Sequence, residues 1–564
     1  MKLTKLSHHR LLWLTLLAGL GLGAALFTAC GRPDEPVFTP TPTRTPRPTP
    51  TLTPSPTPTP AWPVTISIPQ GLPAPVAGAV DDALANHAAL FASAPASAAD
   101  VQVTLNPDSG AAPLAEWVYA VAAPFPTLID DATWADVTAS WNGAPTGPFA
   151  AHPLLMTAET AEALATILGD PAPDGIEILP ASQILQRTWE NRPAWAILPF
   201  DQLEPRWKVL RLDGVSVLDK DLDTAAYPLV VRAGVTGLDR GVTRLEEVLS
   251  APLVNRDTDK MTVLMLTGVT ALARGTAIKM NQHGVTYPAR DIRDWLIEPD
   301  ITHVSNEVSF AENCPQPASY TTMVFCSHPS YIDLFTDVDV DVVELTGNHL
   351  LDWGLGAMEN SLLMYEERSL PYYGGGWDAA RAREPLTLTH SVHTFGFVGC
   401  NPAGPDTDWA AEYRAGSAPC NFGSLAEQLG PQIRKLRERG VIPIVTLQYL
   451  ENPTYTPTGL QQADFRALSE AGAVIVSGSQ AHQPQGFDFV DGAFIHYGLG
   501  NLFFDQMQAL EYRQEFLDRH VFYDGRHIST QVLTAMLEDY SRPRPMTTDE
   551  RKELLQAAFT ASGW

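Results

Sequence analysis

The stretch DVVELTGNHLLDWG, residues 341–354, decides the fold of the C-terminal half of this chain. The pattern of residues 341–346 predicts a strand, and Gly347, Asn348 and His349 follow where that strand would end. In α/β folds, ligands bind at the carboxyl ends of strands. The stretch therefore predicts an α/β domain that presents Asn348 and His349 at one edge of a sheet.

The same pattern, a strand followed by polar residues, recurs four times in the C-terminal half. Because five strand ends that carry Glu, Asn, His or Gln could converge at one edge, we expect a site there. Imidazole, carboxylate and amide oxygen together suit Mn, Fe or Zn in a hydrolase. The other four predicted strands are residues 261–266 before Gly268, 301–306 before Glu307, 441–447 before Gln448, and 473–476 before the segment Gly478 to His482.

The chain from about residue 262 to residue 510 resembles the CapA family, the poly-gamma-glutamate capsule proteins whose domain is similar to calcineurin-like metallophosphatases. The resemblance implies a metallophosphatase-like α/β sandwich and a role in the synthesis, anchoring or turnover of capsule or another surface polymer. The matching segments, in order, are Gly268 to Gly275, Ser305 to Glu307, Asp341 to Gly354, Tyr372 to Gly376, Phe395 to Gly399, Gly478 to Gln485 and Tyr497 to Gln506.

The departures from the family motifs fall on its metal ligands. Val269 stands in the place of an Asp, and Gln448 and Gln480 each stand in the place of a His. The candidate ligands that survive are Glu307, Asn348, His349 and His482. Two metals need more ligands than these four, so we expect one divalent ion (Mn, Fe or Zn) or none.

Three functions are compatible with these four candidate ligands. In a hydrolase or transferase, His349 oriented by Asp352 would act as general acid or base, while Arg274 and Asn348 would hold an anionic group. A catalytically degenerate protein would keep the cleft and bind polymer or another ligand. In a scaffold, a first domain nearer the N-terminus would sense a ligand and this domain would anchor partners. Outside the family motif, Asn348 could simply be a turn residue, and Glu307 could cap a helix.

The first 63 residues indicate export and attachment to a membrane. Basic residues precede an apolar run that ends before Cys30, as in a bacterial lipoprotein signal peptide over residues 1–30. Lipidated Cys30 would anchor the protein on the extracytoplasmic face of the membrane, and the alternative is an uncleaved membrane anchor. Residues 31–63 form a Thr/Pro-rich linker, which is too poor in apolar residues to fold.

Residues 64–235 predict a smaller α/β domain ahead of the CapA-like domain at residues 258–564. Strands are expected at residues 64–68, 117–122 and 195–198, and a helix is expected in the Ala-rich stretch at residues 80–99. The region resembles phosphate-type periplasmic solute-binding proteins, which implies a cleft for a small oxyanion or sugar. The alternative is a packing module without a ligand.

The net charge of the chain narrows the class of molecule that it can bind. The formal net charge of −27 argues against nucleic acid. The family resemblance implies an anionic surface polymer or a cell-wall component as partner, and a polyanion would need a local basic patch or a metal.

Besides Cys30, the sequence has Cys314, Cys326, Cys400 and Cys420. An oxidising compartment favours two disulfides, and pairing neighbours in the sequence closes the shortest loops among three connectivities. Zinc is the alternative, although no C-x2-C spacing supports it.

Overall fold

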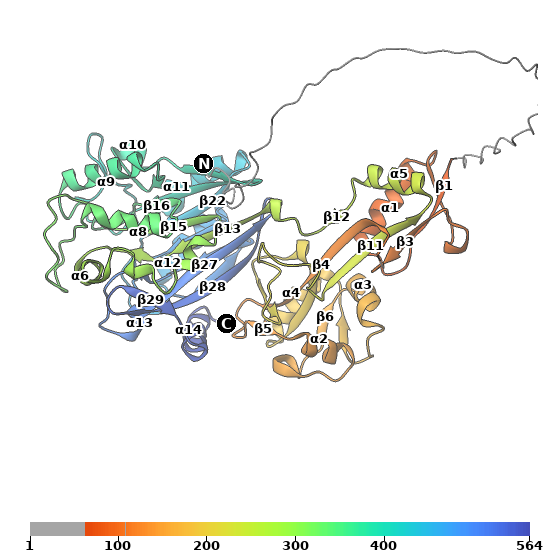
Figure 1. Cartoon of the computed structure of the whole chain (residues 1–564). Coiled ribbons are helices and arrows are strands. Elements are labelled where there is room, and N and C mark those ends of the chain that lie inside the picture. The colour runs from red at the N-terminus through yellow and green to blue at the C-terminus, as the bar shows by residue number, and fades with distance from the viewer. Residues whose placement is uncertain (1–61, 108) are drawn as a thin grey trace, which may run out of the picture. The chain divides into compact units, whose positions relative to one another are not determined.

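The computed structural model describes residues 62–107 and 109–564 (Figure 1). The predicted signal peptide, Cys30 and nearly all of the linker lie outside these residues. The described residues from 62 onward lie within one compact unit. In the described part of the chain, no helix combines the length and apolar character needed to cross a bilayer.

The N-terminal domain is built on a mixed sheet flanked by helices, which confirms the predicted α/β class. The strands run in the order β2-β1-β3-β11-β4-β8-β6-β7, and β9 and β12 pair with β4. These strands are β1 (Val64–Ser67), β2 (Phe91–Ser93), β3 (Val101–Leu105), β4 (Ala112–Pro124), β6 (Leu154–Met156), β7 (Ile176–Ile178), β8 (Trp195–Pro199), β9 (Trp207–Val209), β11 (Val230–Gly237) and β12 (Leu253–Val254). The helices are α1 (Ala74–Asn86), α2 (Trp134–Trp141), α3 (Ala158–Leu168), α4 (Ala181–Glu190) and α5 (Asp239–Leu249).

Two boundaries in this domain differ from the sequence-based expectation. The first helix is α1, which begins at Ala74 with a proline in its first turn, so it lies upstream of the predicted range 80–99. Phe91 at the start of β2 pairs instead with Val64 of β1, because the sheet gives its ring a buried place. At the other end, α5 and β12 extend the domain past residue 235.

The C-terminal domain contains two facing sheets. The first sheet has the order β17-β16-β15-β13-β27-β28-β29, with β14 paired to both β15 and β26, and the second has the order β19-β20-β22-β23-β25-β24. Strands β13, β15, β16 and β17 are parallel, as are β20, β22, β23 and β25. The first sheet comprises β13 (Met261–Thr267), β14 (Val269–Thr270), β15 (Ile301–Asn306), β16 (Val342–Glu344), β17 (Tyr372–Tyr373), β26 (Asn501–Phe503), β27 (Gln514–Tyr523), β28 (Arg526–Glu538) and β29 (Arg542–Pro545). The second comprises β19 (Leu386–His390), β20 (His393–Cys400), β22 (Ile442–Leu447), β23 (Ile475–Gly478), β24 (Phe487–Val490) and β25 (Ala493–His496).

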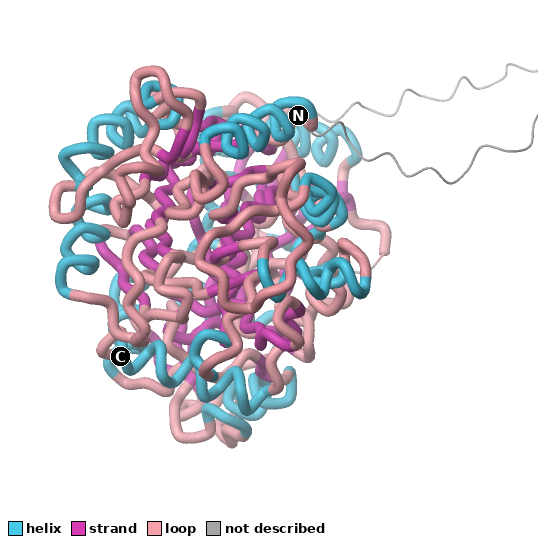
Figure 2. The backbone as a smooth tube through the Cα atoms, turned by 90° about the vertical axis from the view of Figure 1, so that its left-hand side faces the viewer, coloured by secondary structure: helices cyan, strands magenta, loops and turns pink. Residues whose placement is uncertain are grey.

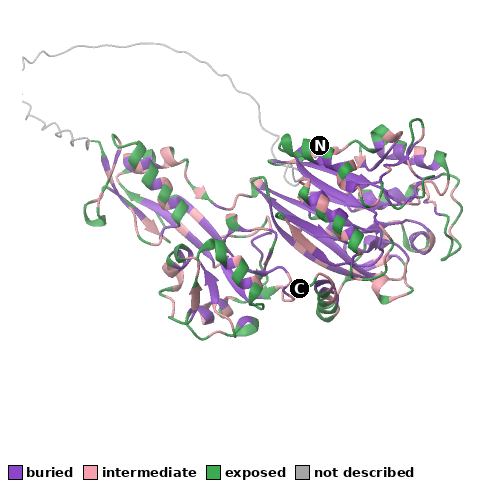
Figure 3. Cartoon of the chain, turned by 180° about the vertical axis from the view of Figure 1, so that it is seen from behind, coloured by how far each residue is buried: buried purple, intermediate pink, exposed green. Residues whose placement is uncertain are grey.

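Helices cover the outer face of each sheet, which gives four layers (Figure 2). Apolar side chains from both sheets meet between them, as in the edge-to-face contact of Phe395 on β20 with Phe522 on β27, 4.8 Å between ring centroids. The strands are buried while the outer sides of the helices are exposed (Figure 3). The helices are α6 (Arg274–His283), α7 (Arg293–Ile297), α8 (Asp333–Asp337) and α9 (Leu355–Glu367) on the first sheet, α11 (Leu425–Glu438) and α12 (Gly459–Glu470) on the second, and α13 (Leu510–Arg513) and α14 (Thr548–Ala561) near the C-terminus.

A buried histidine joins the two sheets. His393 at the start of β20 accepts a hydrogen bond at Nε2 from the backbone N–H of Gly525, 3.1 Å away, in the β27–β28 turn. Its Nδ1 lies 2.8 Å from Oγ1 of Thr262 on β13. Because Nε2 is an acceptor here, the ring fits this place as the neutral tautomer. Burial accordingly lowers the pKa of His393 to about 4, and the nearby His390 adds to the effect.

The structure contains two disulfides, Cys314–Cys326 and Cys400–Cys420, each between cysteines that are neighbours in the sequence. The first closes the loop that follows β15, and the second ties the end of β20 to the segment before α11. Both loops border the edge of the sheets at which the parallel strands end.

His393 makes a testable contribution to the pH dependence of stability. Its folded pKa is about 4, whereas an unfolded histidine has a pKa near 6.5, so the unfolded chain binds more protons between these values. The stability gap between wild type and His393→Gln should therefore shrink by about 1.4 kcal/mol per pH unit as the pH falls from about 6.5 to 4. Urea titrations at several pH values, with the exposed His87→Gln as control, measure this gap. A gap that does not change with pH would contradict the assignment.

Candidate functional site

A cleft of about 650 Å³ lies where the strands of the two facing sheets end. It is lined by four of the residues that the sequence indicates, Arg274, Glu307, His349 and His482. They come from the start of α6 and from the segments that follow β15, β16 and β23. Parallel strands in both sheets end at this edge, so side chains far apart in the sequence meet in one place.

Glu307 lies at the bottom of this cleft, directly after β15. Its side chain is fully buried, and neither carboxylate oxygen has a hydrogen-bond partner among the described residues. Burial raises the pKa of Glu307, while the neighbouring His482 and His349 oppose the rise. Gly347 makes the close packing possible, because a Cβ atom at this position would lie 2.4 Å from Cα of Glu307. Glycine is therefore required beside this carboxylate.

His349 and Asp352 form a hydrogen-bonded pair in the turn after β16. Nδ1 of His349 is 2.7 Å from Oδ2 of Asp352, and the same oxygen accepts the backbone N–H of Phe325 at 2.8 Å. Burial opposes the charge on His349, but the hydrogen bond to Asp352 and the charge of Glu307 raise its pKa overall. The pair has the arrangement of an oriented acid or base that the sequence predicts.

His482 lines the same cleft as His349, in a left-handed backbone conformation with φ of 54°. Its Nδ1 is 2.9 Å from Oδ1 of Asn501, and its Nε2 is 3.6 Å from a carboxylate oxygen of Glu451. Although burial opposes it, the contact with Glu451 and the charge of Glu307 raise the pKa of His482. The ring is therefore held from both sides.

Arg274 is paired within the protein. Its Nε donates to Oδ1 of Asp505 at 3.1 Å, Nη2 donates to the same oxygen, and the backbone N–H of Gly275 donates to Oδ2 at 2.8 Å. The guanidinium carbon lies 4.8 Å from the ring centroids of both Phe325 and Phe504. The charge predicted to hold an anionic group is therefore compensated by Asp505.

The positions that depart from the family motifs are buried beside the cleft. Val269 on β14 is fully buried in an apolar cluster, so it offers no ligand atom. Gln448 donates from Nε2 to Oγ of Ser305 at 3.1 Å, whereas its Oε1 has no partner among the described residues. Both polar atoms of Gln480, and Oδ1 of Asn348, are likewise buried and unpartnered. Buried unpartnered atoms of this kind indicate a place for water or ligand.

The donor set decides how far these residues fit the metal centre that the family resemblance implies. Hydrolase centres with zinc, iron or manganese use several His, Asp, Glu or Cys ligands around each ion. In the described part of the chain, no group of three or more such side chains could hold a metal ion. The surviving residues therefore do not fit such a centre.

Four residues that belong to the site were given no role from the sequence. Asn501 and Asp505 stand in a family motif, and that motif was the signal that could have found them. Glu451 and Tyr540 stand in no motif, because Glu451 lies in a loop and Tyr540 in the turn between β28 and β29. Both line the cleft only because the fold brings these two distant segments to it.

The resemblance to the CapA family is confirmed by comparison with known proteins. Residues 263–506 match the family described as "Bacterial capsule synthesis protein PGA_cap". The "Capsule biosynthesis protein CapA" of Bacillus anthracis is 23% identical over 312 residues, which cover 54% of this chain and 74% of that protein. The "PGA biosynthesis protein CapA" of Bacillus subtilis strain 168 is 25% identical over 179 residues, 31% of this chain. The chain spans about half of the length of this second relative, 45%.

Solved structures show similarities of low score. An ABC-type phosphate transport receptor from Vibrio cholerae has a TM-score of 0.28 and 13% identity, and the match covers 33% of this chain and 93% of that chain. The Haemophilus influenzae NAD nucleotidase NadN has a TM-score of 0.30 and 10% identity, covering 53% of this chain and 56% of that chain.

The pair of Arg274 and Asp505 should stabilise the cleft. The Arg274→Ala variant leaves the carboxylate of Asp505 buried without its cation, so we expect a loss of about 3 kcal/mol in the free energy of unfolding. Adding Asp505→Asn should recover part of this loss, because the amide carries no charge. Chemical denaturation measures both variants, with Arg290→Ala at an exposed ion pair as control. A loss for Arg274→Ala no larger than that of the control would contradict a role in stability.

Proposed function

We propose, from the similarity of residues 263–506 to the bacterial capsule synthesis family, that this protein acts in the synthesis, anchoring or turnover of a surface polymer. We further propose that lipid on Cys30 holds it at the extracytoplasmic face of the membrane, and that the Thr/Pro-rich linker carries the folded domains away from the lipid. The C-terminal cleft would bind the polymer or a cell-wall component.

This proposal rests on the volume of the cleft and on the polar atoms that line it. It keeps a volume of about 650 Å³ and several buried polar atoms without partners, so it can accept ligand groups. At the same time, Val269, Gln448 and Gln480 replace three family ligands, and no metal-binding group is found among the described residues. A cleft of this kind favours binding over metal-dependent catalysis.

A second candidate function is metal-independent acid–base chemistry. The specific observation in its favour is the 2.7 Å contact of His349 with Asp352, in the same cleft as the buried Glu307. Two titratable groups in different surroundings can act as the acid and the base of a hydrolysis. This candidate keeps the same polymer but adds bond cleavage.

Metal analysis separates these candidates from a metal-dependent hydrolase. Residues 62–564 lie within one compact unit, so this fragment can be purified and analysed for bound metals after incubation with Mn, Fe or Zn. We expect far less than one ion per chain, because among the described residues no group of three or more His, Asp, Glu or Cys side chains could hold a metal ion. His349→Ala and His482→Ala serve as matched variants. Near-stoichiometric metal that both substitutions abolish would show a working mononuclear site and overturn the proposal.

The lipid anchor has its own test. In the full chain, Cys30→Ala should move the protein from the membrane fraction to the soluble fraction, since it removes the residue that carries the lipid. Fractionation with immunoblotting measures the shift, and mass spectrometry of the wild type identifies the lipidated N-terminus. If Cys30→Ala stays with the membrane, the apolar run is an uncleaved anchor instead.

A further inference from the structure

A second, larger hollow adjoins the cleft. This hollow, here called the α14 groove, has a volume of about 1180 Å³ and shares Pro453 and Tyr512 with the lining of the cleft. It runs between the loop after β22 and helix α14. Two connected hollows of this size offer room for several units of a polymer. The α14 groove is lined by Pro453, Thr454, Tyr455, Thr456, Gln483, Ala509, Glu511, Tyr512, Asp549, Lys552, Glu553, Gln556, Ala557, Thr560 and Ala561.

The charges along this path do not suit a polyanion. The α14 groove carries three carboxylates, on Glu511, Asp549 and Glu553, against one cation, on Lys552. In the cleft, the charge of Arg274 is compensated by Asp505. A strand of carboxylates or phosphates placed here would meet like charges, which are repulsive at short range.

The remaining lining offers neutral hydrogen-bonding groups and aromatic rings. Hydroxyl and amide side chains line the groove, and Tyr455 and Tyr512 add rings. Tyr455 is held in place because its hydroxyl donates to Oε1 of Gln514 at 2.5 Å. Rings that present an apolar face beside neutral hydrogen-bonding groups match sugar units, which have C–H faces and hydroxyl edges.

A second aromatic pair lies at the far side of the cleft. Tyr320 and Tyr540 are 4.7 Å apart between ring centroids and remain 42% and 37% exposed. The backbone carbonyl of Tyr540 accepts a hydrogen bond from Oγ1 of Thr276 on α6. These contacts hold the exposed rings of Tyr320 and Tyr540 at the cleft, while Tyr512 lies where the cleft and the α14 groove share lining.

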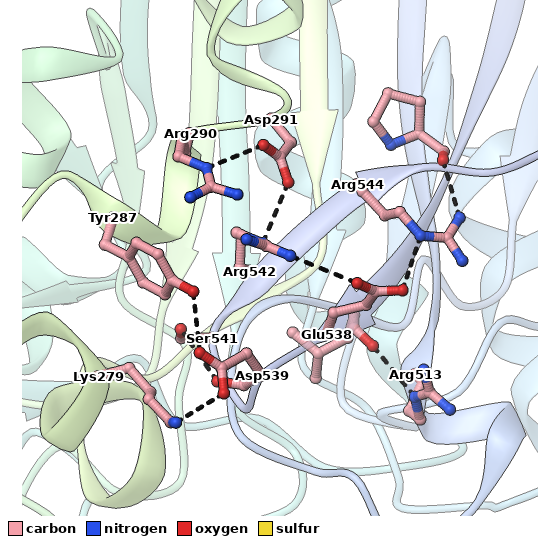
Figure 4. Close-up of polar contacts among 12 residues, drawn as sticks. Lys279, Tyr287, Arg290, Asp291, Arg513, Glu538, Asp539, Ser541, Arg542 and Arg544 are labelled. Atoms are coloured by element: carbon pink, nitrogen blue, oxygen red, sulfur yellow. Dashed lines mark hydrogen bonds and ion pairs between the residues drawn. The ribbon is translucent and has the colours of Figure 1, made fainter. Parts of the chain in front are cut away.

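An ion-pair network fixes the turn that carries Tyr540 (Figure 4). Asp539 binds Nζ of Lys279 at 2.6 Å and accepts from the hydroxyl of Tyr287 at 2.9 Å. On the other side of the turn, Arg542 pairs with Asp291 at 3.1 Å. Because these contacts hold the turn on both sides, the Tyr540 ring loses little conformational entropy when it binds a ligand.

From the charges of the two hollows, their lining residues and the residues that they share, we infer that the cleft and the α14 groove bind a polysaccharide that carries no acidic groups. The inference rests on the proposed function and narrows it, because it names the chemical class of the polymer. Poly-gamma-glutamate and other polyanions are thereby excluded as ligands of this surface.

The test is isothermal titration calorimetry of the purified 62–564 fragment, which lies within one compact unit. The probes are maltohexaose, cellohexaose, chitohexaose, deacetylated chitohexaose and poly-gamma-glutamate at low salt. We expect at least one uncharged or amino-sugar probe to bind with a Kd below about 1 mM, and poly-gamma-glutamate not to bind. The two chitohexaose forms differ in charge, so they distinguish a neutral ligand from a cationic one.

Two sets of variants locate the binding surface. Tyr512→Ala should weaken glycan binding about tenfold, whereas Tyr413→Ala, at a tyrosine that is 89% exposed and lines neither hollow, should leave it unchanged. The double variant Glu511→Lys/Glu553→Lys should gain affinity for poly-gamma-glutamate. Its control is Glu438→Lys/Glu470→Lys on the exposed surface of α11 and α12, which should gain none.

The outcomes separate the inference from the proposed function. Binding of poly-gamma-glutamate to the wild type that Tyr512→Ala abolishes would overturn the inference and leave the proposed function standing. If no probe binds, or if Tyr413→Ala weakens glycan binding as much as Tyr512→Ala, the inference is also overturned. Absence of any polymer binding would count against the proposed function as well.

Discussion

The parallel strands of two facing sheets end at the same edge, and the rest of the C-terminal domain depends on this constraint. Strands β15 and β16 in one sheet and β22 and β23 in the other run parallel to their neighbours, so the segments after them meet at one edge. Core aromatic residues hold the sheets face to face, and His393 joins them through Thr262 and Gly525. Because the sheets are fixed in this way, a cleft forms where their strand ends converge.

The polar character of the cleft follows from that convergence. Glu307 is buried because Gly347 approaches it closely, and the histidines on either side are held by Asp352, Asn501 and Glu451. Arg274, His349 and His482 each lie beside a carboxylate of the protein, while both oxygens of Glu307 have no hydrogen-bond partner among the described residues. Such a site presents no excess of positive charge to a ligand. The α14 groove has the same character, because its lining is also polar and lacks excess positive charge.

The fold and part of the site could be predicted from local patterns. The stretch at residues 341–354 predicted a strand and the turn that carries His349, and both are present as β16 and the following loop. Local patterns failed where burial was decided by distant partners. The Ala-rich stretch after residue 80 looked helical, yet Phe91 enters a strand because β1 and the core accept its ring. Arg274 was predicted to hold an anionic group, yet Asp505, 231 positions away, compensates its charge.

By itself, the sequence determined the α/β class and the order of the motifs that resemble the CapA family. These features depend on residue identity and short-range periodicity, which the chain carries before it folds. Only the tertiary structure decided which charges are compensated, which oxygen atoms are left without partners, and that Tyr512 joins the cleft to a second groove. The physical reason is that charge pairing, burial and cavities arise from side chains far apart in the sequence, which meet only when the two sheets pack.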